Sequence, residues 1–203
     1  MVLEHLPFDS FDFVKLDTQG SELAILHGGP RCLASAIGLK IEVSFTELYD
    51  GQPLFSDIDT HVRGAGFQLL DLRRFYWKRS PFIPKLGRGQ LINGDALYIK
   101  EPKAFLQDLD ECEATKNRIL KYVTVCLVYG FSDLAVWLLL RVQDAGHFPK
   151  DLGEELIRTI KADDGQFGAL LREMRLRLGG VRRMIRRRLW IGRNDWADSD
   201  PLW

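Results

Sequence analysis

The sequence lacks the features that mark several protein classes. Its three cysteines (Cys32, Cys112 and Cys126) show no C-x-x-C spacing and no neighbouring histidine, so we expect reduced, buried thiols and neither a zinc site nor a disulfide framework. Acidic and basic residues balance at 28 each, which makes nucleic acid an unexpected partner. The start at Met1 is acidic and lacks the apolar run of a signal peptide. Together these absences predict a cytoplasmic protein.

One long apolar stretch, residues 122–140, is nearly long enough to span a membrane. Its centre contains Gly130, Ser132 and Asp133, and a charge at that depth is costly. These residues are typical of a turn followed by a helix cap. We therefore predict two buried helices here rather than a transmembrane span.

The chain is organised around residues 11–27. Residues 11–17 form a short, mostly apolar run typical of a strand, and residues 21–27 follow with helical spacing up to a glycine pair. Ligands of open α/β sheets bind outside the carboxyl ends of the strands, and Asp17 falls at such an end. Gly20 would relieve crowding in the turn, and Glu22 falls in the first helical turn, where the helix dipole favours a negative charge.

Three more strands are expected in the first half of the chain. They cover residues 36–45, 67–75 and 96–99, with a helix over 57–63 and a long loop over 77–93. No helical pattern separates the last two strands, which predicts an antiparallel hairpin. In residues 36–45 apolar and polar side chains alternate, so Glu42 is either a solvated surface residue or a carboxylate at the ligand edge of the sheet.

Five segments carry short motifs in a fixed order. Lys15-Leu16-Asp17-Thr18-Gln19-Gly20-Ser21-Glu22 resembles the K-I-D-V-[EQ]-G-x-E signature of FkbM-type methyltransferases. Four later segments resemble further motifs of that family, namely Gly38-Leu39-Lys40-Ile41-Glu42-Val43-Ser44, Leu48-Tyr49-Asp50-Gly51, Gly64-Ala65-Gly66-Phe67 and Asp95-Ala96-Leu97-Tyr98-Ile99-Lys100. The resemblance covers about the first half of the chain.

The resemblance implies an O-methyltransferase that uses S-adenosyl-L-methionine and acts on a hydroxyl of a sugar or secondary metabolite. It implies an α/β fold, a partial Rossmann-like class I methyltransferase sheet with its closing antiparallel hairpin. The matches fall in the second half of that fold only. The glycine-rich loop that binds the cofactor is not found in an appropriate context, so the cofactor-binding residues are unknown. We expect the chain to be truncated at its N-terminus, a fragment of the family's domain.

Two carboxylates are the catalytic candidates. Asp17 would contact the methyl donor or the acceptor, or it would only cap the amides of the following turn. Glu42 is the second, and two carboxylates on adjacent strand ends can raise each other's pKa, which suits a base. Gln19, Gly20 and Glu22 contact substrate or shape the turn. No histidine cluster supports a metal.

Beyond Pro102 the pattern becomes helical. Helices are expected over 104–114, 115–129, 133–145, 152–160 and 166–178, which suggests one domain over residues 1–102 and a helical extension over 103–203. The Arg172–Arg193 region is arginine-rich and amphipathic, so it is either a solvated basic face or a peripheral contact at the inner membrane face. In a half-sheet, strand 11–17 would be an open edge suited to homodimer formation. The alternative function is therefore an inactive scaffold that binds a partner or a membrane.

Overall fold

The computed structural model of the chain describes residues 10–78, 89–109, 113–162 and 197–199. These residues divide into two compact units. The first runs to Phe105 and includes residues 197–199, and the second begins at Leu106. Whether residues 1–102 and 103–203 are separate domains stays a prediction.

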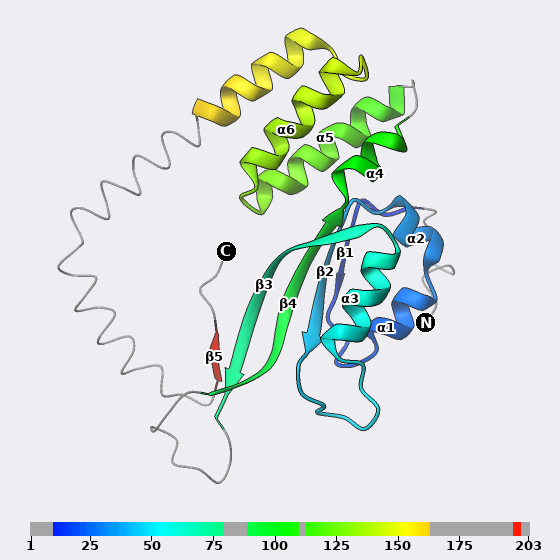
Figure 1. The fold of residues 1–203 in the computed structure, drawn as a ribbon, viewed down its shortest axis with the longest axis vertical. Coiled ribbons are helices and arrows are strands. Elements are labelled where there is room, and N and C mark those ends of the chain that lie inside the picture. The colour runs from blue at the N-terminus through cyan, green and yellow to red at the C-terminus, as the bar shows by residue number, and fades with distance from the viewer. Residues whose placement is uncertain (1–9, 79–88, 110–112, 163–196, 200–203) are drawn as a thin grey trace, which may run out of the picture. The chain divides into compact units, whose positions relative to one another are not determined.

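The first unit is built on a mixed sheet of five strands. Their order is β1 (Phe13–Leu16), β2 (Gly38–Ser44), β4 (Gln90–Lys100), β3 (Phe67–Trp77) and β5 (Ala197–Ser199). β1 and β2 are parallel, whereas β4 lies antiparallel between β2 and β3 (Figure 1). The α/β fold and its closing antiparallel hairpin are thus confirmed.

Three helices accompany this sheet and help to enclose its core. They are α1 (Glu22–His27), α2 (Pro30–Ser35) and α3 (Phe55–Gly64), and α1 and α3 lie on the same side of the sheet in Figure 1. The core joins β1, β2, β4 and these helices through Leu16, Leu26, Leu33, Leu39, Ile41, Val43, Ile58, Val62 and Tyr98.

The second face of the sheet carries the polar side chains. On β2, Lys40 and Glu42 alternate with the fully buried Leu39 and Ile41, so they point away from the core. The register pairs Glu42 with Asp95 of β4. This face therefore gathers charged groups from neighbouring strands.

β3 and β4 are longer than predicted. The predicted loop over 77–93 included Asn93, and the predicted strand began beyond Gly94, at residue 96. Both lie inside β4. The backbone explains the glycine, because a Cβ on Gly94 would stand 2.6 Å from the carbonyl oxygen of Arg73. Strand β5 was also unexpected, since no strand was predicted beyond Pro102; it pairs antiparallel with the end of β3.

The second unit is helical, as predicted. α4 (Pro102–Gln107) leads into it, and α5 (Glu113–Val128), α6 (Ser132–Asp144) and a helix over residues 150–162 follow. Gly130, with φ of 81°, turns the chain between α5 and α6, which confirms the predicted split of the apolar stretch. In the described part of the chain, no helix is long and apolar enough to cross a membrane. The predicted helix over 166–178 and the Arg172–Arg193 region lie outside the described residues.

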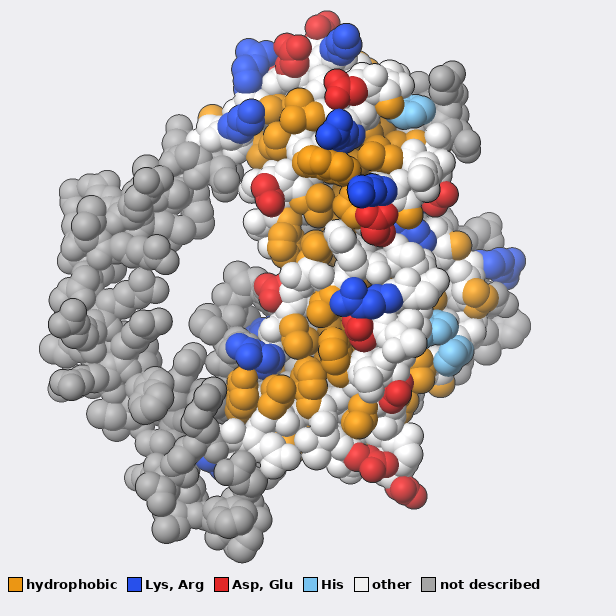
Figure 2. Space-filling model, in the orientation of Figure 1, with side chains coloured by type: hydrophobic (Ala, Val, Ile, Leu, Met, Phe, Trp, Pro, Cys, Tyr) orange, Lys and Arg blue, Asp and Glu red, His pale blue; other side chains and the backbone are white. Residues whose placement is uncertain are grey.

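The surface agrees with the balanced composition. On the face shown in Figure 2, basic and acidic side chains are interspersed among apolar ones, and neither sign forms a large field. Global electrostatic attraction of a polyanion is therefore not a feature of the surface in view.

Candidate functional site

The turn after β1 has an unusual backbone. Gln19 has φ of 56° and Gly20 has φ of 108°, and a non-glycine residue rarely takes such a conformation. Glu22, which is 3% exposed, holds the turn from inside. Its carboxylate accepts hydrogen bonds from the Thr18 amide (2.6 Å), the Thr18 hydroxyl (2.9 Å) and the Gly20 amide (2.9 Å). Glu22 therefore shapes the turn, one of the two roles we considered for it.

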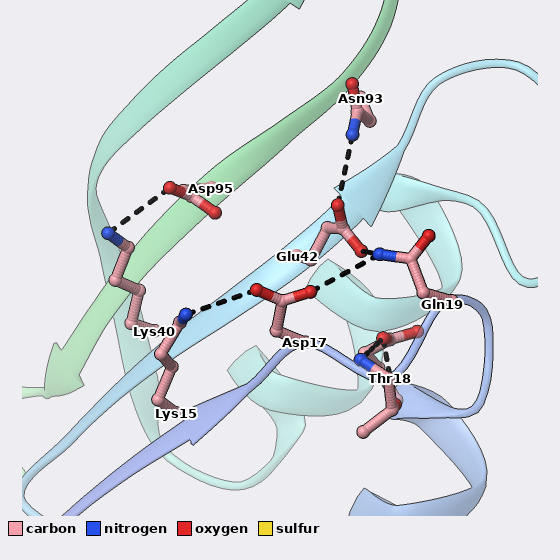
Figure 3. Close-up of polar contacts among 9 residues, drawn as sticks. Lys15, Asp17, Thr18, Gln19, Lys40, Glu42, Asn93 and Asp95 are labelled. Atoms are coloured by element: carbon pink, nitrogen blue, oxygen red, sulfur yellow. Dashed lines mark hydrogen bonds and ion pairs between the residues drawn. The ribbon is translucent and has the colours of Figure 1, made fainter.

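The turn aims the Gln19 side chain across the carboxyl ends of β1 and β2. Its Nε2 donates to Glu42 Oε2 at 2.8 Å and lies 3.4 Å from Asp17 Oδ1 (Figure 3). One amide thus bridges two carboxylates that are 25 residues apart in sequence, as counted from positions 17 and 42. The strained backbone at Gln19 coincides with this bridge, as strain often does at functional sites.

Asn93 completes the cluster from a third strand. Its Nδ2 donates to Glu42 Oε1 at 3.1 Å, so both oxygens of Glu42 are held (Figure 3). The Asn93 Oδ1 atom is buried and has no hydrogen-bond partner. Sequence reasoning missed Asn93 because it placed the residue in a loop. Extending the alternation of strand 96–99 backwards would have put Asn93 on the same face as Asp95.

The environments of the two carboxylates push their pKa values apart. A hydrogen bond from Lys15, whose Nζ is 3.1 Å from Asp17 Oδ2, is the main cause that lowers the pKa of Asp17. Burial is the main cause that raises the pKa of Glu42, and the negative charge of Asp17 adds to it. Asp17 is thus the firmly ionised anion of the pair, and Glu42 is the stronger base.

A second ion pair flanks the cluster. Lys40 Nζ lies 3.2 Å from Asp95 Oδ2, and both side chains are largely buried, with exposures of 19% and 16%. Asp95 stands opposite Glu42 in the register, and like charges directly opposite on neighbouring strands are destabilising. Lys40 offsets part of that repulsion through Asp95, while the oxygens of Glu42 are held by the two amide donors (Figure 3).

The arrangement brings most of the predicted site residues together. Asp17, Gln19 and Glu42 form one hydrogen-bonded cluster, while Gly20 and Glu22 build the turn beneath it. Within the described ranges, no three His, Cys, Asp or Glu side chains are grouped so that they could hold a metal ion. An ionised carboxylate beside a more basic one can attract a cationic group and accept a proton from a hydroxyl.

Another pairing was not foreseen, that of two histidines in α1 and α3. The rings of His27 and His61 lie 4.3 Å apart between their centroids. Burial and the neighbouring His27 lower the pKa of His61, so this environment favours the neutral form of the His61 ring.

One comparison with known protein families agrees with the sequence resemblance. The family profile described as the methyltransferase FkbM domain matches residues 2–69. Among solved structures, a DNA modification methylase candidate from Thermus thermophilus, complexed with S-adenosyl-L-methionine, is 20% identical, with a TM-score of 0.28. A selenomethionine form of the same protein gives 20% identity and a TM-score of 0.29.

Coverage in these comparisons is partial. The chain spans about half of the length of each solved structure, 48% and 49%, and the matches cover 49% of this chain. A search of the curated proteins gives no match. The likeness to the FkbM methyltransferase domain therefore covers residues 2–69, about a third of the chain.

Proposed function

Residues 2–69 match the FkbM methyltransferase domain family, and from that premise we propose that the chain acts in methyl transfer from S-adenosyl-L-methionine to a hydroxyl of a sugar or secondary metabolite. The observation that supports this best is the bridged carboxylate pair of Asp17 and Glu42 at the carboxyl ends of β1 and β2. In an open α/β sheet this edge is where ligands bind.

Glu42 is the proposed general base. Its raised pKa makes it more basic than an ordinary carboxylate, and the Gln19 and Asn93 amides fix both of its oxygens. It would accept the proton of the acceptor hydroxyl as the methyl carbon bonds to that oxygen and its bond to the donor sulfur breaks, which leaves a neutral thioether. General bases of this kind contribute about 10²–10⁴-fold to rate.

Asp17 is the proposed electrostatic partner of the donor. When bound, S-adenosyl-L-methionine supplies an electrophilic methyl group on a positively charged sulfonium. The chemistry of the cluster fits that end of the cofactor, because Lys15 keeps Asp17 ionised and a fixed anion stabilises a nearby cation. The residues that would hold the rest of the cofactor are not assigned.

A calorimetric titration with S-adenosylhomocysteine tests the donor site separately from the acceptor. We expect saturable micromolar binding by the full chain, weakened in Asp17→Asn. Absence of heat from a folded sample would contradict the proposal.

Transfer of a tritiated methyl group to a panel of neutral glycosides tests the chemistry. Glu42→Gln should lower the rate by about 10²–10⁴-fold, because the amide cannot take a proton. The matched control is Glu155→Gln, which alters an exposed carboxylate in the helix over 150–162 and should leave the rate unchanged. Equal rates in the two variants would remove Glu42 from the mechanism.

A binding role is the second candidate, and the position of β1 favours it. Within the described sheet β1 pairs with β2 alone. The Asp12 carbonyl accepts from the Ile37 and Gly38 amides, so by alternation the Lys15 backbone faces the outer edge. We propose homodimer formation through this edge. Peripheral membrane contact by Arg172–Arg193 belongs to the same proposal and concerns residues outside the described ranges.

Light scattering tests the strand edge. Lys15→Pro removes an outward backbone donor and should convert a dimer to a monomer. A wild-type chain that is monomeric at high concentration would contradict the dimer.

A further inference from the structure

The loop between β2 and α3, residues 45–54, exposes two large apolar side chains. Leu48 is 41% exposed and Tyr49 is 56% exposed. They are adjacent in sequence and belong to the sheet unit, whereas the other strongly exposed apolar side chains among the described residues lie on α5 and α6. We call residues 45–54 the β2–α3 loop.

A single side chain fastens this loop from within. Gln52 Oε1 accepts hydrogen bonds from the Leu48 and Tyr49 amides at 3.1 and 3.3 Å. Its Nε2 donates to the Ser44 hydroxyl at 2.9 Å. Gln52 thus ties the backbone that carries the two apolar side chains to the end of β2, so their exposure is the property of an ordered loop.

The same glutamine places the loop beside the carboxylate cluster. Ser44 follows Glu42 by two positions on β2, so both project from one face of the strand. Gln52 also packs on the turn after β1, since its Cγ and Nε2 would lie 3.5 Å from a Cβ on Gly20. Gln19, the neighbour of Gly20, is the residue that bridges Asp17 and Glu42.

The charges at this edge select against anions. Asp17, Glu42 and Asp95 stand close together, and the two nearby lysines are engaged in ion pairs with Asp17 and Asp95. The loop adds Glu47, whose carboxylate accepts from the Gly51 amide at 2.6 Å. An acceptor with a phosphate or carboxylate beside its hydroxyl would meet repulsion here, whereas an uncharged acceptor would not.

We propose that Leu48 and Tyr49 form the surface on which the apolar face of an uncharged, hydroxylated ring rests, with Gln52 as the positioning residue of that surface. Apolar contacts with a few fixed polar groups are the usual composition of a small-molecule site. The Tyr49 ring would cover the C–H face of the ligand, while its hydroxyls reach the cluster around Glu42. This inference rests on the proposed function, since it describes the acceptor side of the same site.

Saturation-transfer NMR on the full chain tests the surface without a methyl donor. The probes are phenyl β-D-glucopyranoside and phenyl β-D-glucuronide, which differ in a neutral hydroxymethyl group against a carboxylate. We expect transfer to the glucoside and little or none to the glucuronide. Equal signals from both probes, or none from the glucoside, would overturn the inference.

Variants locate the contact. Tyr49→Ala should weaken glucoside binding by about tenfold, the scale of one aromatic contact, whereas Tyr49→Phe should retain it. Gln52→Leu should weaken it without altering Tyr49 itself. Val128→Ala is the matched control, because Val128 is 73% exposed and lies in the helical unit. Unchanged binding in Tyr49→Ala would overturn the assignment of the surface.

The two proposals fail in different ways. Glucoside binding that depends on Tyr49, without any methyl transfer, would contradict the proposed function and leave the surface intact. Methyl transfer to other hydroxyls at a rate that Tyr49→Ala leaves unchanged would support the proposed function and contradict the assignment of the surface.

Discussion

Gln19 has a strained backbone conformation and a side chain that bridges the carboxylates of Asp17 and Glu42. Its φ of 56° costs on the order of 1–3 kcal/mol for a residue with a side chain, and the conformation directs its amide to Glu42 at 2.8 Å. A turn built for stability alone would favour glycine at this position. The glutamine is therefore best explained by what its side chain contacts.

We predict that Gln19→Gly separates stability from activity. Glycine relieves the strain but adds backbone entropy to the unfolded chain, so the free energy of unfolding should change by less than about 1 kcal/mol. Methyl transfer should fall at least tenfold because the bridge is lost. Gln19→Asn is the matched variant: it keeps an amide and tolerates positive φ, but it is one methylene too short. Both effects are measured by urea unfolding and tritium transfer, and a Gly variant of full activity would contradict the role of the bridge.

Glu42 should lower stability at neutral pH. Its pKa is raised in the folded protein, mainly by burial, so the unfolded chain loses this proton first as pH rises. Stability from this group is complete below the ordinary glutamate pKa of 4.5, which the unfolded chain has, and is lost as pH rises through the folded pKa. Glu42→Gln removes the ionisation and should be more stable than the parent at pH 7, with a smaller difference at pH 4.

Urea unfolding at the two pH values measures that difference. The control Glu155→Gln should show no such pH dependence. If Glu42→Gln changed stability equally at pH 4 and pH 7, burial of the ionised Glu42 would not be the cause.

Among the secondary-structure elements, the β3–β4 hairpin supplies Asn93 and Asp95 to the site. Gly94 separates Asn93 from Asp95, and its Cβ position lies 2.6 Å from the Arg73 carbonyl oxygen. Gly94→Ala should force β3 and β4 apart and cost on the order of 1–3 kcal/mol, as overpacking does. Gly64→Ala is the control, because nothing lies within 4 Å of a Cβ at the end of α3. A Gly94→Ala protein as stable as the control variant would show that the hairpin can widen freely.

The elements that could be predicted are those that short-range sequence patterns determine. The β1–turn–α1 unit follows from an apolar run, a glycine turn and helical spacing within residues 11–27, and the alternation in β2 correctly indicated two faces. Asn93 was missed because the predicted strand began only at residue 96. Its alternation would have placed Asn93 on the face of Asp95, but the position of Asn93 beside Glu42 also depends on pairing with β2, whose Ser44 lies 49 positions earlier. Gly94 continues the strand because a Cβ there would meet the Arg73 carbonyl oxygen.

For the whole molecule, two compact units predict two unfolding transitions. The sheet unit has its own core around Ile41, and α6 contributes the fully buried Leu138 to the helical unit. Ile41→Ala and Leu138→Ala should each cost about 2–5 kcal/mol, and each should shift a different transition in calorimetry. One transition that moves with both variants would show that the units unfold as one.

The order of the strands along the chain has a practical consequence for dividing the protein. β5 comes from residues 197–199 yet completes the sheet beside β3, so the helical unit is inserted within the sheet unit rather than appended to it. A gene shortened after Phe105 would encode a sheet without its outermost strand, with the backbone of Phe75–Trp77 newly unpaired on that side. Such a product would be prone to self-association.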